Sequence, residues 1–181
     1  MLVSISDYVL TIRLEDILSS ITIVLTCIGG IGALFQWRRT NKINRASYIN
    51  ELTDKIRSDN DIRETLYKLE YDKNWYIQNF HNSGKLELQF DKTLSYFSYI
   101  CYLRHMKIIS EKEFSFFKYE ITRILGNTGI QGYLFNLYHF SRSIGTPMTF
   151  HYLFEYGKEH EIFPSSFYDK DSNEYEKKLN F

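Results

Sequence analysis

Three residues in the C-terminal half carry side chains that general acid–base chemistry uses, namely His139, Arg142 and Glu155. A histidine exchanges protons near neutral pH, a carboxylate can orient it, and a guanidinium can hold an anionic substrate. A helical fold can bring such residues into one pocket, although Glu155 lies well beyond the other two in the sequence. One hypothesis is therefore an enzyme whose site is assembled from these three residues.

The familiar sequence patterns of metal and nucleotide sites do not occur. His151 and Glu155 lie four residues apart and His160 follows, but no further ligand recurs on that helix face. The glycine-rich stretch 29–32 lies in an apolar run and not between a strand and a helix, so it does not predict a phosphate loop. The two cysteines of the chain make neither a metal pair nor a disulfide framework. We therefore expect no cofactor, no metal and no catalytic residue.

Aromatic and polar-tipped residues are concentrated around Trp75 and along the segment 130–142. Tyrosine and tryptophan offer a large contact area at low conformational entropy, with one end that tolerates water. One interpretation is a ligand or partner surface made from Trp75, Tyr133, Asn136, His139 and Arg142. The alternative is that these residues simply pack the interior of a tyrosine-rich domain.

No charged residue occurs from residue 17 to residue 37. At about 1.5 Å per residue a helix of this length covers roughly 30 Å, the thickness of the hydrocarbon core of a bilayer. A cleaved signal peptide would begin with basic residues and end at a small-residue cleavage site. Residues 1–16 instead hold three acidic residues and one arginine, and no such site follows the run. We therefore expect residues 17–37 to form an uncleaved transmembrane helix.

Four basic residues follow this run, with no acidic residue before Glu51: Arg38, Arg39, Lys42 and Arg45. Basic flanks remain on the cytoplasmic side of a membrane. We therefore expect residues 1–16 to form a short extracytoplasmic N-terminus and the rest of the chain to lie in the cytoplasm, at an inner (plasma) membrane. A second interpretation is recognition of anionic lipids, for which about four to eight basic residues are usual.

Small residues recur every three or four positions within the run, at Ser19, Thr22, Thr26, Gly29 and Ala33. This spacing puts them on one helix face, where a second helix can approach closely and threonine can hydrogen-bond across the contact. Such residues are also common in membrane helices for other reasons. The pattern predicts that the membrane helices associate and that the protein is a homo-oligomer.

Beyond the membrane run, apolar residues recur with a helical period, and no segment shows the alternation typical of strands. Turn and capping patterns separate the helical segments, at residues 58–61, 81–84, 110–113, 126–127 and 145–147. The sequence thus predicts an all-α protein: a single N-terminal transmembrane helix followed by a compact bundle of about five helices. The cytoplasmic helical domain should cover residues 38–164, its third and fourth helices should form the central hairpin, and the polar residues 165–181 should form a flexible tail.

Three segments of the bundle carry a pattern of aromatic and acidic residues: Leu-Ser-Tyr-Phe-Ser-Tyr-Ile-Cys-Tyr-Leu at 94–103, Lys-Ile-Ile-Ser-Glu-Lys-Glu-Phe at 107–114 and Arg-Ile-Leu at 123–125. In these segments the chain resembles an uncharacterised bacterial family of single-pass membrane proteins with a cytoplasmic helical domain. The resemblance covers residues 17–160 and implies that architecture, with no activity or catalytic residue to carry over. Some small membrane proteins of this general design act in bacterial defence against phage.

The chain has 22 basic and 22 acidic residues. This balance argues against a nucleic-acid-binding protein, since such proteins carry a basic excess. The leading hypothesis is a non-enzymatic, self-associating interaction or sensor module, anchored in the lipid bilayer, that binds a cytoplasmic protein or ligand. The alternatives are a membrane-damaging effector of a phage-defence or toxin system, and the enzyme with an assembled site.

Overall fold

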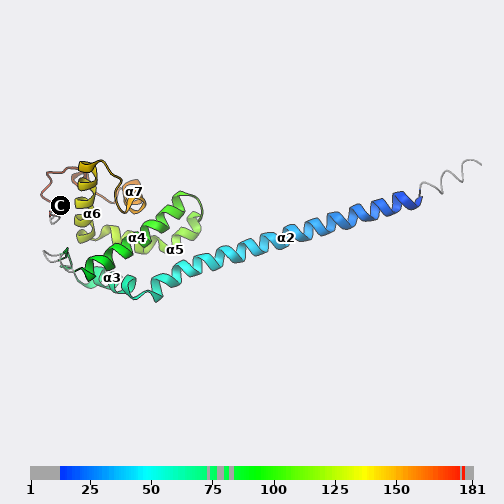
Figure 1. Cartoon of the computed structure of the whole chain (residues 1–181), viewed down its shortest axis with the longest axis horizontal. Helices are drawn as coiled ribbons and strands as arrows, with labels where there is room; N and C mark the ends of the chain where they lie inside the picture. The colour runs from blue at the N-terminus through cyan, green and yellow to red at the C-terminus, as the bar shows by residue number, and fades with distance from the viewer. Residues whose placement is uncertain (1–12, 73, 77–79, 82–83, 176, 178–181) are drawn as a thin grey trace, which may run out of the picture. The chain divides into compact units, whose positions relative to one another are not determined.

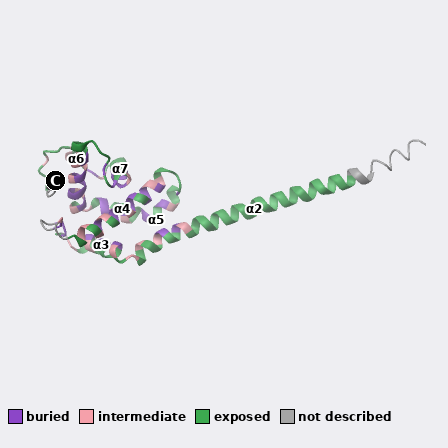
Figure 2. Cartoon of the chain, in the orientation of Figure 1, coloured by how far each residue is buried: buried purple, intermediate pink, exposed green. Residues whose placement is uncertain are grey.

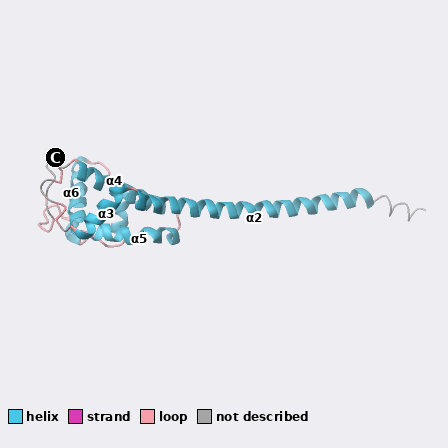
Figure 3. Ribbon diagram, turned by 90° about the horizontal axis from the view of Figure 1, so that it is seen from below, coloured by secondary structure: helices cyan, strands magenta, loops and turns pink. Residues whose placement is uncertain are grey.

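The computed structural model describes residues 13–181 apart from 73, 77–79, 82–83, 176 and 178–181 (Figure 1). Every regular element among these residues is a helix, as Figure 3 shows, which confirms the predicted all-α fold. The chain divides into two units, residues 1–50 and residues 51–181. The predicted extracytoplasmic N-terminus lies outside the described residues up to residue 12.

The first element, α2, is one α-helix from Arg13 to Ser58. The predicted membrane helix and the first helix after it are therefore continuous, because no proline or glycine interrupts the chain between residues 33 and 58. Among the described residues, α2 is the one helix that is long and apolar enough to cross a membrane. Its apolar stretch has no buried residue, and the helix is drawn in the exposed colour along that stretch in Figure 2.

The second unit contains the end of α2 and the five helices of the predicted bundle: α3 (Asn60–Tyr71), α4 (Lys85–His105), α5 (Glu111–Gly126), α6 (Thr128–Ile144) and α7 (His151–Glu159). Helix α4 is the centre, in contact with α3, α5 and α7. The expected hairpin of α4 and α5 is present, but α4 makes its most extensive contact with α7, a helix distant in sequence.

Local sequence signals set the helix boundaries. Ser110 and Glu113 form the predicted capping box, which satisfies backbone N–H groups at the start of α5. Asn127 ends α5 with its backbone N–H, which donates to the Ile124 carbonyl oxygen, and its side-chain Oδ1 accepts hydrogen bonds from the Gly129 and Ile130 N–H groups in the first turn of α6. Gly145 ends α6 in the left-handed conformation, with φ of 68°, which glycine adopts without strain.

Phenylalanine rings dominate the interior of the second unit. The largest fully buried side chains include Phe80, Phe90, Phe97, Phe114, Phe117, Phe135, Phe150 and Phe167. The predicted flexible tail is wrong for residues 165–175: a 3₁₀ helix forms at Ser165–Tyr168, Phe167 is completely buried, and Tyr175 stacks on Phe135 with ring centroids 4.7 Å apart. Two large aromatic side chains in a polar segment bury enough apolar area to hold it against the bundle.

Candidate functional site

Two of the five residues predicted to form a ligand or partner surface lie in the core. Trp75 and Tyr133 are 2% and 3% exposed. The Trp75 ring stacks on Phe90 with centroids 4.0 Å apart, and its Nε1–H donates to Asn127 Oδ1 at 3.2 Å. The structure thus places both rings in the interior, as the alternative interpretation has it, because a large ring with its polar atom satisfied is more stable when buried.

Tyr133 nevertheless takes part in a polar pair at the junction of α4 and α6. Its hydroxyl donates to Asp91 Oδ1 at 2.7 Å. Burial raises the pKa of the Asp91 carboxyl above its ordinary value, although the Tyr133 hydrogen bond works in the opposite direction. Burial and the adjacent Asp91 likewise raise the pKa of the Tyr133 phenol. The pair is thus a hydrogen bond between a buried phenol and a half-buried carboxyl, and burial disfavours the charged form of both groups.

A second polar pair lies beside the first. His81 Nδ1 is 2.8 Å from Glu87 Oε1. The other ring nitrogen, Nε2, is buried with no hydrogen-bond partner among the described residues, and the imidazole lies against the rings of Tyr76, Phe80 and Tyr133. A carboxylate-oriented imidazole is the arrangement of a general base. Here aromatic rings surround it, so a substrate could reach Nε2 only if the cluster opened.

His81, Glu87, Asp91 and Tyr133 form one polar cluster, of which only Tyr133 was singled out from the sequence. Its signal was present: Glu87 and Asp91 are four residues apart on one helix face, and a histidine shortly precedes that helix. No sequence spacing, however, reveals that α6 supplies the Tyr133 hydroxyl from 42 residues further along the chain.

The remaining three predicted residues lie further along α6 and make different contacts. The Asn136 amide donates to the Tyr76 hydroxyl at 2.8 Å. His139 Nε2 is 3.0 Å from the Phe167 carbonyl oxygen, so it carries the proton and donates it there. Arg142 is exposed and donates to the Tyr138 hydroxyl at 3.2 Å. Asn136 and His139 thus tie α6 to neighbouring segments.

A shallow hollow of about 300 Å³ lies between α6 and the C-terminal segment. Its lining consists of Phe135, Asn136, His139, Phe140, Ser143, Lys170, Asp171 and Lys177. Neither Arg142 nor Glu155 lines it. This hollow therefore does not gather the three residues from which the enzyme hypothesis was built.

A larger hollow, of about 510 Å³, lies along the outer face of α3. It is lined by Arg63, Glu64, Tyr67, Lys68, Tyr71 and Asp72, here called the tyrosine face. Tyr67 and Tyr71 are 67% and 66% exposed, and their ring centroids are 4.5 Å apart. They are four residues apart and lie off the apolar stripe that α3 buries, so the helical period alone could have revealed them.

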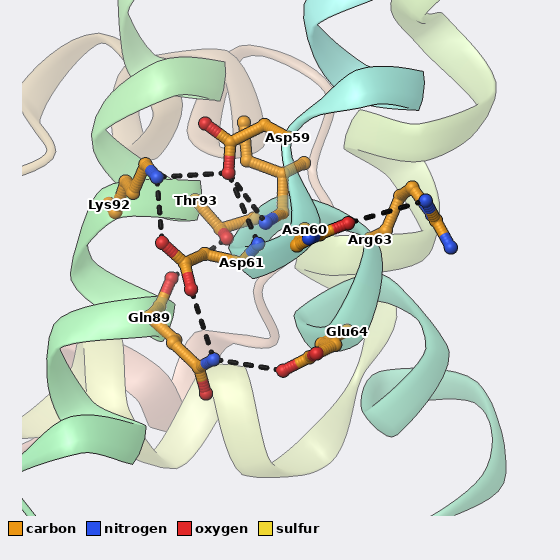
Figure 4. A network of polar contacts seen from close by, with 9 residues as sticks. Asp59, Asn60, Asp61, Arg63, Glu64, Gln89, Lys92 and Thr93 are labelled. Atoms are coloured by element: carbon orange, nitrogen blue, oxygen red, sulfur yellow. Dashed lines mark hydrogen bonds and ion pairs between the residues drawn. The ribbon is translucent and has the colours of Figure 1, made fainter.

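A charged network holds α3 against α4 (Figure 4). Lys92 Nζ lies 2.9 Å from Asp59 Oδ1 and 2.7 Å from Asp61 Oδ2. Asp59 also accepts from backbone N–H groups at the start of α3. The hydrogen bonds from Lys92 lower the pKa of both carboxyls. Gln89 of α4 donates hydrogen bonds to Asp61 and Glu64 at 3.1 and 3.0 Å. These contacts hold α3, the helix that bears the tyrosine face, in place on α4.

The small residues of α2, namely Ser19, Thr22, Thr26, Gly29 and Ala33, are all exposed, and a Cβ added at Gly29 would meet nothing within 4 Å. The Thr22 and Thr26 hydroxyls each donate at 2.8 Å to the carbonyl four residues earlier. Their protons are thus used within the helix. A helix that packs on this face would be held by close approach more than by threonine donors.

The basic residues that follow, Arg38, Arg39, Lys42 and Arg45, are also exposed on α2. They share this helix with the apolar stretch and precede the first acidic residue, Glu51.

Among the described residues no group of three or more His, Cys, Asp or Glu side chains is arranged to hold a metal ion. His160 Nδ1 instead lies 2.9 Å from the Tyr156 carbonyl oxygen of its own helix. Burial raises the pKa of the Cys101 thiol to about 12, which leaves it unreactive at neutral pH. No protein-family model, curated protein or solved structure matches the chain, so the resemblance to an uncharacterised bacterial family stays a prediction.

Proposed function

We propose that the protein is a membrane-anchored docking module: α2 holds it in the bilayer, and the tyrosine face of α3 binds a cytoplasmic protein. The observation that carries the proposal is the pair of exposed, mutually packed rings of Tyr67 and Tyr71 on the wall of a hollow. We also propose that the protein lies in the inner (plasma) membrane with its N-terminus outside. The basic residues after the apolar stretch support this orientation.

The anchor is supported by the state of α2 itself. Its stretch of large apolar side chains is exposed, with Ile23, Leu25 and Ile28 each more than 60% exposed. A continuous apolar surface of this length is unfavourable in water, and the hydrocarbon core of a bilayer covers it without any further partner.

The docking face is supported by its composition. Tyrosine and arginine are the residue types enriched where protein partners bind, because each gives a large contact with polar ends. Tyr67 and Tyr71 already pack on each other, so little side-chain entropy is lost when a partner covers them. Arg63 and Lys68 flank the rings with Glu64 and Asp72, a rim of mixed charge that suits a polar protein surface.

Photo-crosslinking in native membranes tests the docking face. A benzophenone amino acid at position 67 should give one discrete adduct with a partner on illumination. The matched control is the same probe at Phe116, which is 68% exposed on α5 and lies outside the hollow. Equal adducts from both positions, or none from position 67, would remove the docking role from this face.

Self-association through the small-residue face of α2 is the second part of the proposal. It is supported by the placement of the five small residues on one face of α2. A membrane-potential dye separates this module from the alternative of a membrane-damaging effector: the module leaves the potential of expressing cells unchanged, whereas clustering that permeabilises the membrane collapses it.

A further inference from the structure

The segment of α2 directly after the apolar stretch carries charge of one sign. Arg38, Arg39, Lys42 and Arg45 are exposed there, and no acidic residue occurs from residue 17 to residue 50. We infer that these four residues, here called the basic collar, bind the phosphate headgroups of anionic phospholipids. The inference rests on the membrane anchor of the proposed function and adds the class of ligand that the anchor recognises.

The depth of the collar matches the headgroup layer. Because α2 is one uninterrupted helix, Arg45 lies about 12 Å along the axis from Trp37, at about 1.5 Å per residue. The polar layer of each leaflet is roughly 5–8 Å thick, and lysine and arginine side chains extend several ångströms back toward the interface. All four cationic groups can therefore reach the level of the phosphates.

The collar also points away from the small-residue face. At about 100° per residue, Arg38, Lys42 and Arg45 fall within roughly 60° of one another around the helix axis. Their direction is roughly 150° from the centre of the face that contains Thr26 and Gly29. If a second copy packs on that face, the collar stays directed at lipid.

The chemistry of the collar suits phosphate. An arginine fork donates two parallel hydrogen bonds to phosphate oxygens, and a lysine adds a compact charge. The attraction of one such residue to an anionic surface corresponds to roughly a fivefold change in local headgroup concentration. A collar that only fixed the orientation of the helix in the membrane would need the positive charge but would bind no lipid in preference to another.

Trp37 is a built-in reporter because it directly precedes the collar. The full chain is reconstituted in vesicles of phosphatidylglycerol and phosphatidylcholine, with brominated acyl chains on one lipid at a time. The other tryptophan, Trp75, is 2% exposed in the helical bundle and gives a constant background. We expect bromine on phosphatidylglycerol to quench Trp37 more strongly, with an association constant roughly five times that of phosphatidylcholine.

The variants separate charge from structure. Replacing all four collar residues by Gln should bring the ratio of the two association constants to about one. The triple variant R38K/R39K/R45K keeps the charge and should keep the preference. The matched control removes four exposed lysines from the bundle, at positions 107, 112, 118 and 158, and should leave the preference unchanged.

Each further outcome has one meaning. Strong but equal quenching by the two lipids overturns the inference and leaves the anchor standing. Inorganic phosphate that removes the preference more effectively than chloride of equal ionic strength overturns the lipid assignment in favour of a soluble phosphate compound. Quenching by neither lipid means that Trp37 is outside the bilayer, which overturns the anchor itself.

Discussion

Arg104 joins three helices of the bundle, and its removal gives the most quantitative prediction. Its Nη1 and Nη2 lie 2.8 and 3.2 Å from the two carboxylate oxygens of Glu159 on α7, and its Nε lies 2.8 Å from Glu111 of α5. The guanidinium also stacks over the rings of Phe114 and Tyr156, at 5.3 and 5.2 Å from their centroids. Its side chain is 18% exposed.

Replacing Arg104 by Met keeps the apolar stem and removes the charged head. Each of the two cation–π contacts contributes about 0.5–1 kcal/mol. The ion pairs add only about 0.2–1 kcal/mol in all, because the Glu111 and Glu159 side chains are 73% and 57% exposed and regain water when the arginine is lost. The variant should therefore lose about 2 kcal/mol of stability, or roughly 4–8 °C in the unfolding midpoint.

The loss should depend on pH. The Arg104 guanidinium holds the pKa of the Glu159 carboxyl below its ordinary range. The ion pair therefore contributes fully above the ordinary glutamate pKa of about 4.3 and is lost as the pH falls through the lower pKa of the folded state. A Glu159→Gln variant should accordingly be destabilised at pH 7 and indistinguishable from the wild type in acid.

Thermal unfolding of the full chain in detergent, followed by near-ultraviolet circular dichroism at several pH values, measures both variants. A deficit of Glu159→Gln that stays constant into acid would refute the ion-pair argument. Unchanged stability of Arg104→Met at every pH would refute the stacking argument as well.

A Cβ at Gly157 would lie 2.5 Å from Phe163 Cε2, in a packed aromatic layer. The Gly157→Ala variant should therefore lose about 1–3 kcal/mol of unfolding free energy. The control Gly126→Ala, where the added Cβ meets open space, should lose none in the same denaturation assay. Burial raises the pKa of Asp91, so its ionisation lowers the stability of the fold as the pH rises. The Asp91→Asn variant should therefore have a higher unfolding midpoint than the wild type at neutral pH and the same midpoint in acid, where Asp91 is protonated. A lower midpoint of the variant at neutral pH would contradict this. The double variant Thr26→Leu/Gly29→Leu should weaken self-association in a membrane dimerisation assay by at least tenfold, about 1.4 kcal/mol, whereas Val24→Phe/Ile31→Phe on the opposite face should not; equal effects would remove the small-residue face as the contact.

The helices were predictable because their signals are local. The apolar run of α2, the capping box at Ser110 and Glu113, and the glycine at the end of α6 each act within a few residues of themselves. The central position of α4 and its contact with α7 depend on packing between segments some 50 residues apart, which no local pattern encodes.

The site was predicted less well, for a physical reason. A tyrosine has both a large apolar ring and a hydroxyl, so composition does not decide whether it is buried, as Tyr133 is, or exposed, as Tyr67 is. The helical period does decide it for α3, because Ile62 and Leu66 define the buried stripe. On α6 the period also places Tyr133 on the buried stripe, with Ile130 and Leu137. It does not reveal that the Tyr133 hydroxyl meets Asp91 of another helix.

The most direct test of the membrane anchor is the fraction of the full-length chain that stays in the membrane after an alkaline carbonate wash. Full retention is expected for the wild type, and loss for a variant with lysine at both Leu25 and Ile28, since each central lysine disfavours insertion by about 2.5–3.5 kcal/mol. Release of the wild-type chain into the wash would contradict the account, because α2 would then be covered by something other than a bilayer.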